Sequence, residues 1–548
     1  AQGVEGACVP PSRPPPWHPC LASGNMASPY SPGSAGLPPW WQKAAISVGA
    51  TVSLVAAIRY LKRQEQAMGK ASIVGTSSDA ANVSEVTDIK ASQALCVEKY
   101  IQDCAASLKA GITDADIKNV GDLAKYLSFK PEYGTQFMAR PDVGQGELLR
   151  VTDWRLLTPA DYDRTCFHFE VDIRGTSIEH LCNGADGKAL SVYATNDAEK
   201  VSAFISEMGL DPHAIVSADE IAPPDEEGMV VLTTVERLFL QYLDIFGKPT
   251  REFLKKLFPF AHNIADKVKI AELTLDRNTE EFQDRQARAM TFADYLTEFK
   301  SLRIPVDKYV ELVPTIKQRV YSICSSSDYR PGKCQLLVVR EDWQAKGGQT
   351  KYGLCSSFLT HIRAGSYCLG HSTHSVMKIP EDKTAPVFMA GLGTGLAPFR
   401  AFVEQRKLQK DQGFVVGPMT LFFGGRYSKA EYYYREEFES YETQGLLKCC
   451  NAWSRDQDGS KFACSNTPGA KKVYVQHKIS EEADSIWENL GKVGSKGYFF
   501  LCGSKQPEKD VFAALLEIFR SKGNMSESQA RARMEELQTV GRYVTEVY

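Results

Sequence analysis

The sequence predicts an α+β protein of several domains: an antiparallel β-barrel interrupted by a helical insertion, an α/β domain with a parallel sheet, and a single membrane helix near the N-terminus. Three observations support this prediction. The chain has 548 residues, too many for one hydrophobic core. From Leu148 onward, short runs alternate apolar and polar residues between turn signals, as in antiparallel strands. A glycine-rich stretch at 389–400 lies between an apolar run and a helical pattern, as in parallel α/β sheets.

The composition excludes several classes of protein. The net charge is −3, which argues against a nucleic acid as the main partner. The 14 cysteines contain no C-x-x-C pair, so we expect neither a disulfide scaffold nor a zinc site, and a reducing compartment is favoured for the main body. His371 and His374 have a possible ligand spacing, but no further ligands accompany them, so no metal is expected.

The N-terminal part shows three kinds of pattern. Residues 1–39 are rich in Pro, Ser and Gly and are expected to be disordered or to be a targeting segment. Residues 40–63 contain an apolar run flanked by aromatic residues, which predicts a membrane anchor; a cleaved segment or a helix buried against a partner are the alternatives. Residues 64–146 have the pattern of a linker with short helices.

Basic residues follow the apolar run directly, at Arg59, Lys62 and Arg63. This excess of positive charge predicts that the body of the protein faces the cytosol or matrix side of the membrane. The membrane is that of the endoplasmic reticulum, the mitochondrion or the plastid, and the pattern does not distinguish among the three.

The barrel is expected in two parts, at 147–234 and 301–380, on either side of a helical insertion at 235–300. Residues 166–173 and 189–194 are strand candidates with turn signals between them. Residues 235–243 and 251–257 have apolar positions at helical spacing.

The glycine turn opens the C-terminal domain, residues 381–548. Gly391, Gly393 and Gly395 follow the apolar run at 385–390 and precede a helical pattern. Because glycine has no Cβ, the backbone can come close to a pyrophosphate at the N-terminus of the helix. The spacing is not G-x-G-x-x-G, since Leu396 stands where the last glycine would be, and a tight turn without a ligand is the alternative.

The sequence Arg319-Val320-Tyr321-Ser322 matches the R-x-Y-S motif of the ferredoxin–NADP reductase superfamily. Its continuation to Ser326 resembles the diflavin branch of that superfamily, and residues 352–359 resemble the branch's second FAD loop. The helical insertion resembles its connecting domain. An arginine offers a planar fork to a diphosphate, and a tyrosine offers a flat face to a flavin. The resemblance implies that FAD is bound by Arg319, Tyr321, Ser322, Gly353, Leu354, Cys355, Ser356 and Tyr548.

Residues 419–426, 451–455 and 472–477 resemble later motifs of the same branch. Arg and Lys bind a 2′-phosphate dianion well, whereas NAD sites commonly place a carboxylate on the ribose, so NADP is favoured over NAD. Residues 456–471 are more numerous than the family pattern has between two motifs, which predicts a surface insertion. The residues assigned to NADP are Gly391, Gly393, Thr394, Gly395, Arg400, Ser454, Arg455, Lys472, Tyr474, Gln476 and Cys502.

The resemblance also implies the reaction, which is hydride transfer from NADPH to FAD. Ser322, Cys502 and Glu546 are expected to line the hydride path, and Tyr548 to form an aromatic lid that the nicotinamide displaces. Glu546 and Tyr548 replace the Asp and Trp of the P450-reductase pattern. The alternatives are a merely structural buried thiol for Cys502 and a solvated carboxylate for Glu546.

Diflavin enzymes carry an FMN-binding flavodoxin domain before the FAD half, and residues 64–146 are too few for one. We therefore expect a separate electron acceptor: a ferredoxin, a flavodoxin-like protein, a cytochrome or a membrane complex. Two alternatives remain, the reverse flow from reduced ferredoxin to NADP⁺ and an accessory subunit of a membrane electron-transport complex with little turnover. An NADH-using cytochrome b5 reductase type is disfavoured by Ser454 and Arg455.

Overall fold

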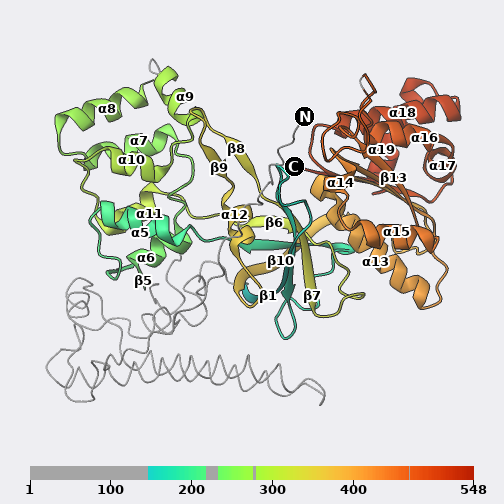
Figure 1. The fold of residues 1–548 in the computed structure, drawn as a ribbon, viewed down its shortest axis with the longest axis horizontal. Coiled ribbons are helices and arrows are strands. Elements are labelled where there is room, and N and C mark those ends of the chain that lie inside the picture. The colour runs from blue at the N-terminus through green and yellow to red at the C-terminus, as the bar shows by residue number, and fades with distance from the viewer. Residues whose placement is uncertain (1–145, 218–231, 276–278, 468) are drawn as a thin grey trace, which may run out of the picture.

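The computed structural model describes residues 146–217, 232–275, 279–467 and 469–548. The predicted membrane anchor at 40–63, with the segments on either side of it up to 145, lies outside the described residues. Within the described ranges, every helix is too short or too polar to traverse a bilayer. Figure 1 shows a central barrel with a helical unit on one side and an α/β domain on the other.

The barrel is a six-stranded antiparallel sheet in the order β6-β3-β10-β1-β2-β7. Its two edge strands meet through a bridge between Ile323 and Leu336, and the N–H of Cys324 donates to the carbonyl oxygen of Gln335 at 2.8 Å. The sheet therefore closes on itself there, which confirms the predicted antiparallel barrel. The strands are β1 (Glu147–Leu156), β2 (Cys166–Asp172), β3 (Asp186–Tyr193), β6 (Arg319–Ser322), β7 (Lys333–Val339) and β10 (Tyr367–Lys378).

Strand β2 is buried on both faces rather than on one. Phe167 and Phe169 point into the barrel core, and the polar residues that alternate with them, His168 and Glu170, are also buried. The burial of His168 is tolerated because its Nδ1 has a hydrogen-bond partner, the hydroxyl of Tyr434 in the α/β domain, at 2.9 Å. The alternation visible in the sequence thus separates a core face from an interdomain face.

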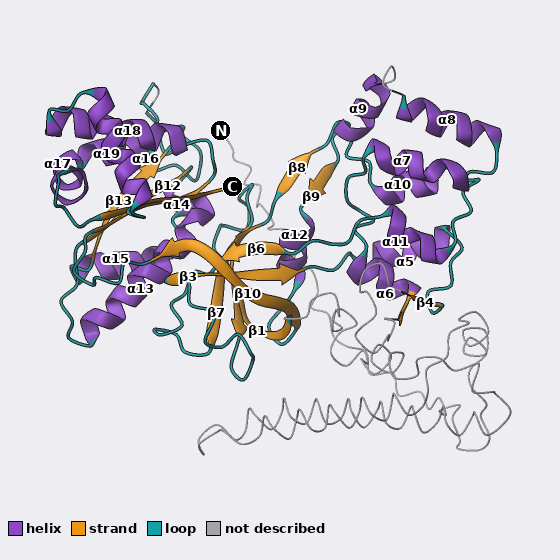
Figure 2. Ribbon diagram, turned by 180° about the vertical axis from the view of Figure 1, so that it is seen from behind, coloured by secondary structure: helices purple, strands orange, loops and turns teal. Residues whose placement is uncertain are grey.

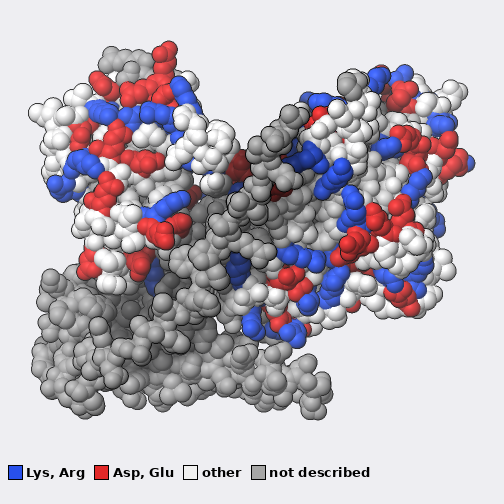
Figure 3. Space-filling model, viewed as in Figure 1, with Lys and Arg blue, Asp and Glu red and all other residues white. Residues whose placement is uncertain are grey.

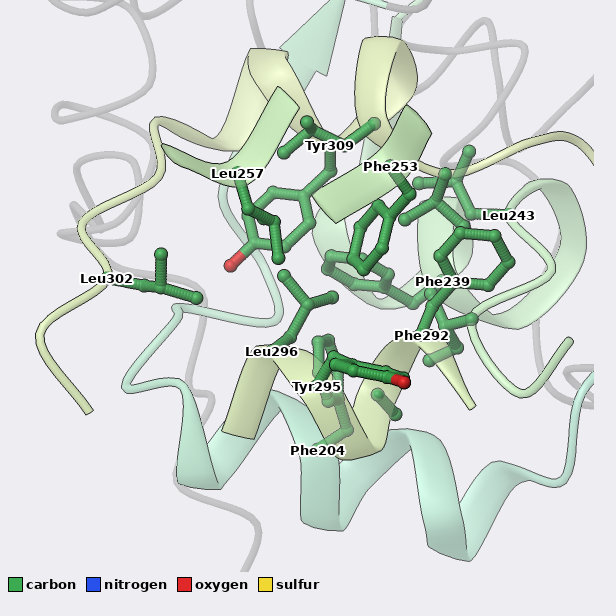
Figure 4. Close-up of a cluster of buried hydrophobic side chains, with 14 of the residues drawn as sticks. Phe204, Phe239, Leu243, Phe253, Leu257, Phe292, Tyr295, Leu296, Leu302 and Tyr309 are labelled. Atoms are coloured by element: carbon green, nitrogen blue, oxygen red, sulfur yellow. The ribbon is translucent and has the colours of Figure 1, made fainter. Parts of the chain in front are cut away.

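The helical unit is larger than predicted. Helix α5 (Ala198–Glu207) already belongs to it, because Phe204 packs edge-to-face on Phe239 at 5.2 Å between ring centroids. Figure 4 shows both rings in a shared core with side chains from the later helices. Among the described residues, the helices that share this core therefore include α5 before the predicted range of 235–300 and α11 after it. Its other helices are α6 (Val235–Arg237), the π-helix η2 (Leu238–Tyr242), α7 (Arg251–Leu257), α8 (Ile264–Thr274), α9 (Thr279–Ala287), α10 (Phe292–Glu298) and α11 (Tyr309–Leu312).

Four short strands lie outside the two main sheets among the described residues. Strands β4 (Ile215–Ser217) and β5 (Leu232–Thr234) form one small pair, and the hairpin of β8 (Asp342–Gln344) and β9 (Thr350–Tyr352) projects from the barrel toward α9 (Figure 2). Helix α12 (Leu354–His361) follows the hairpin directly. In the view of Figure 3, acidic and basic side chains are interspersed over both visible lobes.

The C-terminal domain has a five-stranded parallel sheet in the order β13-β12-β11-β14-β15, with helices on both faces (Figures 1 and 2). The strands are β11 (Val387–Leu392), β12 (Met419–Gly425), β13 (Leu447–Trp453), β14 (Tyr498–Gly503) and β15 (Tyr543–Val547). The main helices are α13 (Ala397–Asp411), α14 (Ser428–Glu431), α15 (Arg435–Thr443), α16 (Val475–Glu481), α17 (Ala483–Ile486), α18 (Glu508–Gly523) and α19 (Glu527–Thr539). The predicted strand, glycine turn and helix are confirmed as β11, a 3₁₀ turn at Gly393–Leu396, and α13.

Candidate active site

Three strands of the parallel sheet bring candidate residues together at its carboxyl edge. Gly391 of β11 pairs with Cys502 of β14, and Cys502 pairs with Glu546 of β15. Beyond these strands, the Oγ1 of Thr394 lies 2.8 Å from the hydroxyl oxygen of Tyr548. Ligands of open α/β sheets bind at this edge. The fold therefore joins the glycine turn to the last three candidate residues of the chain.

The glycine turn requires glycine at two positions for different reasons. A Cβ on Gly395 would lie 2.1 Å from the carbonyl oxygen of Cys502, so the turn packs directly on the end of β14. Gly393 has φ +58°, where L side chains are disfavoured, and a Cβ there would meet open space. The turn is thus closely packed on one side and open on the other. This is the shape that a bound pyrophosphate requires above a helix N-terminus.

Cys502 and Glu546 are neighbours on adjacent strands at this edge. Burial and the nearby Glu546 carboxylate raise the pKa of the Cys502 thiol well above its ordinary value, so it stays protonated. Glu546 is half-buried, and its Oε2 accepts a hydrogen bond of 2.6 Å from the hydroxyl of Ser375 on β10. A neutral thiol and an oriented carboxylate therefore stand side by side at the sheet edge. Ser375 was not predicted, because its partner is 171 residues away in the sequence.

On the barrel side, candidate residues of β6 lie close to candidate residues of α12, although the two elements are distant in the sequence. Tyr321 on β6 lies near the thiol of Cys355 on α12, and this thiol donates a long hydrogen bond of 4.0 Å to the carbonyl oxygen of Val192 on β3. Burial raises the pKa of that thiol to about 11, against the opposing effects of Tyr321 and of the Arg319 charge. Ser322 ends β6 and is half-buried opposite Ala189. Arg319 is exposed, and its guanidinium makes only weak contacts of 3.3 Å with the carbonyl oxygens of Lys317 and Gln318.

The loop that is predicted to bind a diphosphate leads directly into the N-terminus of α12. Gly353 is the N-cap of α12 and makes no side-chain capping bond. Leu354 and Cys355 form the first turn of the helix. The Ser356 hydroxyl accepts the N–H of Glu341 at 3.1 Å, which fixes the loop on the preceding hairpin. The first N–H groups of a helix lack internal partners, so this end can bind an anion.

Arg340 is a candidate that the sequence analysis missed. Its Nε atom is buried without a hydrogen-bond partner, and its guanidinium lies 4.9 Å from the centroid of the Tyr352 ring. A buried guanidinium donor is costly unless something accepts its hydrogen bond. Its place directly after the apolar strand β7 was the available signal. Together with Arg319 and the α12 N-terminus, Arg340 makes the barrel side fit a diphosphate-containing cofactor.

The candidate phosphate-binding residues lie on two segments of the α/β domain. Ser454 and Arg455 follow β13, and their N–H groups donate to the carbonyl oxygens of Gly425 at 3.0 Å and Arg426 at 2.9 Å. Lys472 and Tyr474 precede α16, with Tyr474 as its N-cap. Gln476, in the first turn of α16, donates a weak hydrogen bond to Asp510. Arg455, Lys472 and Tyr474 are exposed, so they are available to an anionic ligand.

Arg400 has a different place from the one predicted. Its side chain is 1% exposed, and its guanidinium binds Glu437 at 2.8 Å and the carbonyl oxygen of Cys324 at 2.7 Å. Glu404 lies one turn along α13, 3.0 Å from the guanidinium. The donors of Arg400 are used inside the protein to join the two domains, and this disfavours the predicted contact with NADP.

Tyr434 lies at an interdomain contact in an unusual backbone conformation. It has φ 55° and precedes α15, which begins at Arg435. Its hydroxyl contacts His168 at 2.9 Å and its ring lies 4.4 Å from the Arg400 guanidinium carbon. A non-glycine residue in this conformation is uncommon and persists where the surroundings fix it. Here the fixing surroundings are the interdomain contacts.

Two histidines at possible ligand spacing lie on β10. His374 Nδ1 lies 3.4 Å from the Lys188 ammonium, and the His371 ring lies against Tyr193 with 5.8 Å between centroids. Among the described residues there is no group of three or more His, Cys, Asp or Glu that could hold a metal ion.

Comparisons with known proteins agree with this geometry. A family model described as an FAD binding domain matches residues 145–358, and one described as an oxidoreductase NAD-binding domain matches residues 389–512. The chain is 34% identical over 440 residues to the sulfite reductase [NADPH] flavoprotein component of Saccharomyces cerevisiae, an alignment that covers 79% of this chain and 40% of that protein.

Two further relatives have the same arrangement. The NADPH–cytochrome P450 reductase of Musca domestica is 30% identical over 398 residues, covering 70% of this chain and 56% of that protein. The NADPH-dependent diflavin oxidoreductase 1 of Mus musculus is 30% identical over 409 residues, covering 73% and 64%. The chain therefore spans less than two thirds of the length of each of these curated relatives.

Proposed function

Because the chain belongs to the ferredoxin–NADP reductase family, in its diflavin-reductase branch, we propose that it is an NADPH-dependent flavoenzyme that passes electrons to a separate protein acceptor. One observation carries the proposal: Cys502, Glu546 and Tyr548 meet the glycine turn at one edge of the parallel sheet. Bound FAD would supply the chemistry, by taking up a hydride and releasing electrons.

In this proposal, the role of each candidate site residue follows from its position. Arg319, Arg340 and the α12 N-terminus bind the diphosphate of FAD, and Tyr321 lies beside its ring system. The turn at Gly391, Gly393 and Gly395 binds the pyrophosphate of NADPH. Thr394 holds the phenol of Tyr548, so the aromatic ring covers the place that the nicotinamide takes. While the nicotinamide is absent, the ring excludes water from this place. Displacement of the ring then admits the nicotinamide.

At the reacting edge, the two side chains divide the work. The Cys502 thiol keeps its proton, so it presents a small neutral surface to the nicotinamide. Ser375 holds the Glu546 carboxylate in one orientation, where it balances positive charge and can accept or return a proton. Ser322 closes the same region from the barrel side. Arg455 and Lys472 favour NADPH over NADH through its 2′-phosphate.

An anaerobic NADPH titration of the full chain, following the flavin absorbance bands, tests the proposal. We expect bleaching at about one NADPH per flavin, with NADH much weaker. Arg455→Ala should weaken the response to NADPH but not to NADH. The control is Arg531→Ala, which removes one partner of an exposed ion pair with Glu527 and should change neither response. A purified chain without flavin, or with flavin that NADPH does not bleach, would support an accessory subunit instead.

We also propose that the protein is attached to a membrane through residues 40–63, on the strength of the sequence pattern alone. The full chain produced in a eukaryotic host should sediment with membranes and resist extraction by alkaline carbonate. A chain that lacks residues 40–63 should be recovered in the supernatant. Release of the full chain by carbonate would contradict the proposal.

A further inference from the structure

The insertion at 456–471 is folded against its own domain. The Asp456 side chain is buried and accepts the N–H of Ser428 at 2.9 Å. The hydroxyl of Tyr427 donates to Asp458 at 2.5 Å, and the Lys429 ammonium donates to the carbonyl oxygen of Ala463 at 2.7 Å. These bonds hold residues 456–463 of the insertion on α14 and on the residue before it.

The insertion also reaches the other domain, at the loop of residues 157–164 between β1 and β2. The ring of Tyr162 lies 4.9 Å from that of Phe462 and 6.1 Å from that of Tyr427, both edge-to-face. Asp161 of the loop forms an ion pair with Lys461 of the insertion. Tyr162 is 9% exposed, so the contact is packed and excludes water.

A charged group fastens the same loop beneath the insertion. The Tyr162 hydroxyl donates to the buried carboxylate of Glu431 at 2.6 Å. The Arg426 guanidinium binds Glu431 at 2.9 Å and Asp163 through two hydrogen bonds of 2.8 and 3.0 Å. Bidentate pairs of this kind are the strongest of the charge-assisted hydrogen bonds. We call Tyr162, Asp163, Arg426, Glu431 and Phe462 the clasp.

Arg426 connects the clasp to the candidate phosphate-binding segment. Its side chain holds Asp163, while its carbonyl oxygen accepts the N–H of Arg455 at 2.9 Å. The insertion itself begins directly after Arg455 and ends directly before Lys472. Arg455 is therefore hydrogen-bonded to a residue that the barrel domain holds through the clasp, and Lys472 lies at the other end of the insertion that carries Phe462.

From this arrangement we propose that the clasp determines the specificity for NADPH over NADH, by fixing Arg455 and Lys472 in position for the 2′-phosphate. The inference rests on the proposed function and deepens it. Both cations are exposed side chains at the two ends of a long insertion. Without the contact at Phe462, the two side chains would become ordered only when the ligand binds. The entropy lost in that ordering would reduce the affinity for the ligand.

The test is calorimetric binding of 2′,5′-ADP and of 5′-ADP to the full-length protein. Phe462→Ala removes the ring that packs on Tyr162, and Tyr162→Phe removes only the hydroxyl that binds Glu431. The matched control is Phe414→Ala, an aromatic residue of the same domain that is 49% exposed and outside the clasp. We expect Phe462→Ala to weaken 2′,5′-ADP about tenfold and Tyr162→Phe about threefold, with 5′-ADP unchanged.

Steady-state kinetics give a second readout. The KM for NADPH should rise in both variants with kcat unchanged, and the KM for NADH should stay as in the wild type. A charge swap guards against simple misfolding. Asp161→Lys should weaken 2′,5′-ADP through repulsion from Lys461, and adding Lys461→Asp should restore it, because both side chains are exposed and tolerate the change.

The outcomes separate the two proposals. Wild-type affinity for 2′,5′-ADP in Phe462→Ala, or an equal loss for 2′,5′-ADP and 5′-ADP, would overturn the role of the clasp while leaving the reductase function intact. If the wild type binds 2′,5′-ADP no better than 5′-ADP, the NADPH preference in the proposed function fails, whatever the variants do.

Discussion

The guanidinium of Arg400 donates a 2.7 Å hydrogen bond to the carbonyl oxygen of Cys324, which joins the helix after the glycine turn to the barrel domain. The same guanidinium neutralises Glu404 and Glu437, so two carboxylates and a carbonyl group share one buried cation. The α/β domain therefore balances the charge of Arg400 itself, and the barrel domain adds the neutral acceptors of Cys324 and Gln335, which join the two domains.

Arg400→Met should lower the free energy of unfolding by about 3–5 kcal/mol, because it leaves the buried Glu404 carboxylate with Arg330 as its remaining ion-pair partner and removes the donor to the Cys324 carbonyl oxygen. Urea denaturation followed by far-UV circular dichroism measures this loss. Arg531→Ala, which breaks an exposed pair with Glu527, should change stability by less than about 0.5 kcal/mol. If Arg400→Met left the stability unchanged and weakened the binding of 2′,5′-ADP, Arg400 would be a phosphate ligand and not an interdomain contact.

Two alanine substitutions in the glycine turn should differ sharply. Gly395→Ala forces a Cβ against the Cys502 carbonyl oxygen, so the turn must move and NADP⁺ binding should be lost. Gly393→Ala meets open space and costs only about 1–2 kcal/mol for its left-handed conformation. Calorimetry with NADP⁺ and urea denaturation of both variants are the measurements. Greater damage from Gly393→Ala would contradict this account of the turn.

His168 should make the protein less stable in acid. Burial lowers its pKa to about 3, whereas in the unfolded chain it is about 6.5. Between these values the unfolded state binds more protons, so the stabilising effect is complete above about pH 6.5 and declines as the pH falls toward 3. Each pH unit in that window should cost up to about 1.4 kcal/mol.

Urea denaturation at pH 7 and pH 5 measures the effect. His168→Gln should lose much less stability than the wild type between the two values, because glutamine does not take up a proton. His361→Gln is the control: that histidine is exposed, and its variant should follow the wild type. Equal pH dependence in His168→Gln and the wild type would show that the acid sensitivity arises elsewhere.

Tyr548→Ala should tighten NADP⁺ binding about tenfold, because the nicotinamide no longer has to displace an aromatic ring. Tyr548→Phe loses only the hydrogen bond to Thr394 and should stay within about threefold of the wild type. Calorimetric titration of NADP⁺ distinguishes the two variants. Weaker binding in Tyr548→Ala would mean that the ring contacts the dinucleotide instead of blocking it.

The sequence determined the features that depend on neighbouring residues. The strand, glycine turn and helix from Val387 to Asp411 follow from local apolar runs and from glycines that allow a close approach. The strand with Arg319 and Tyr321, and the short helix from Leu354, were likewise visible as motifs. Their chemistry was predictable because each motif carries its own donors.

The tertiary structure decided the partners that are distant in the sequence. Arg400 follows the glycine turn directly and looks like a phosphate ligand there, but the fold places Cys324 and Glu437 against it, and a buried guanidinium satisfies the nearest acceptors. The same holds for Ser375 and Glu546. Helix α5 belongs to the helical unit because Phe204 packs on Phe239, and a contact between residues so far apart is not visible in any local sequence pattern. Local propensity fixes elements, whereas burial and electrostatic pairing between elements fix which side chains remain free for a ligand.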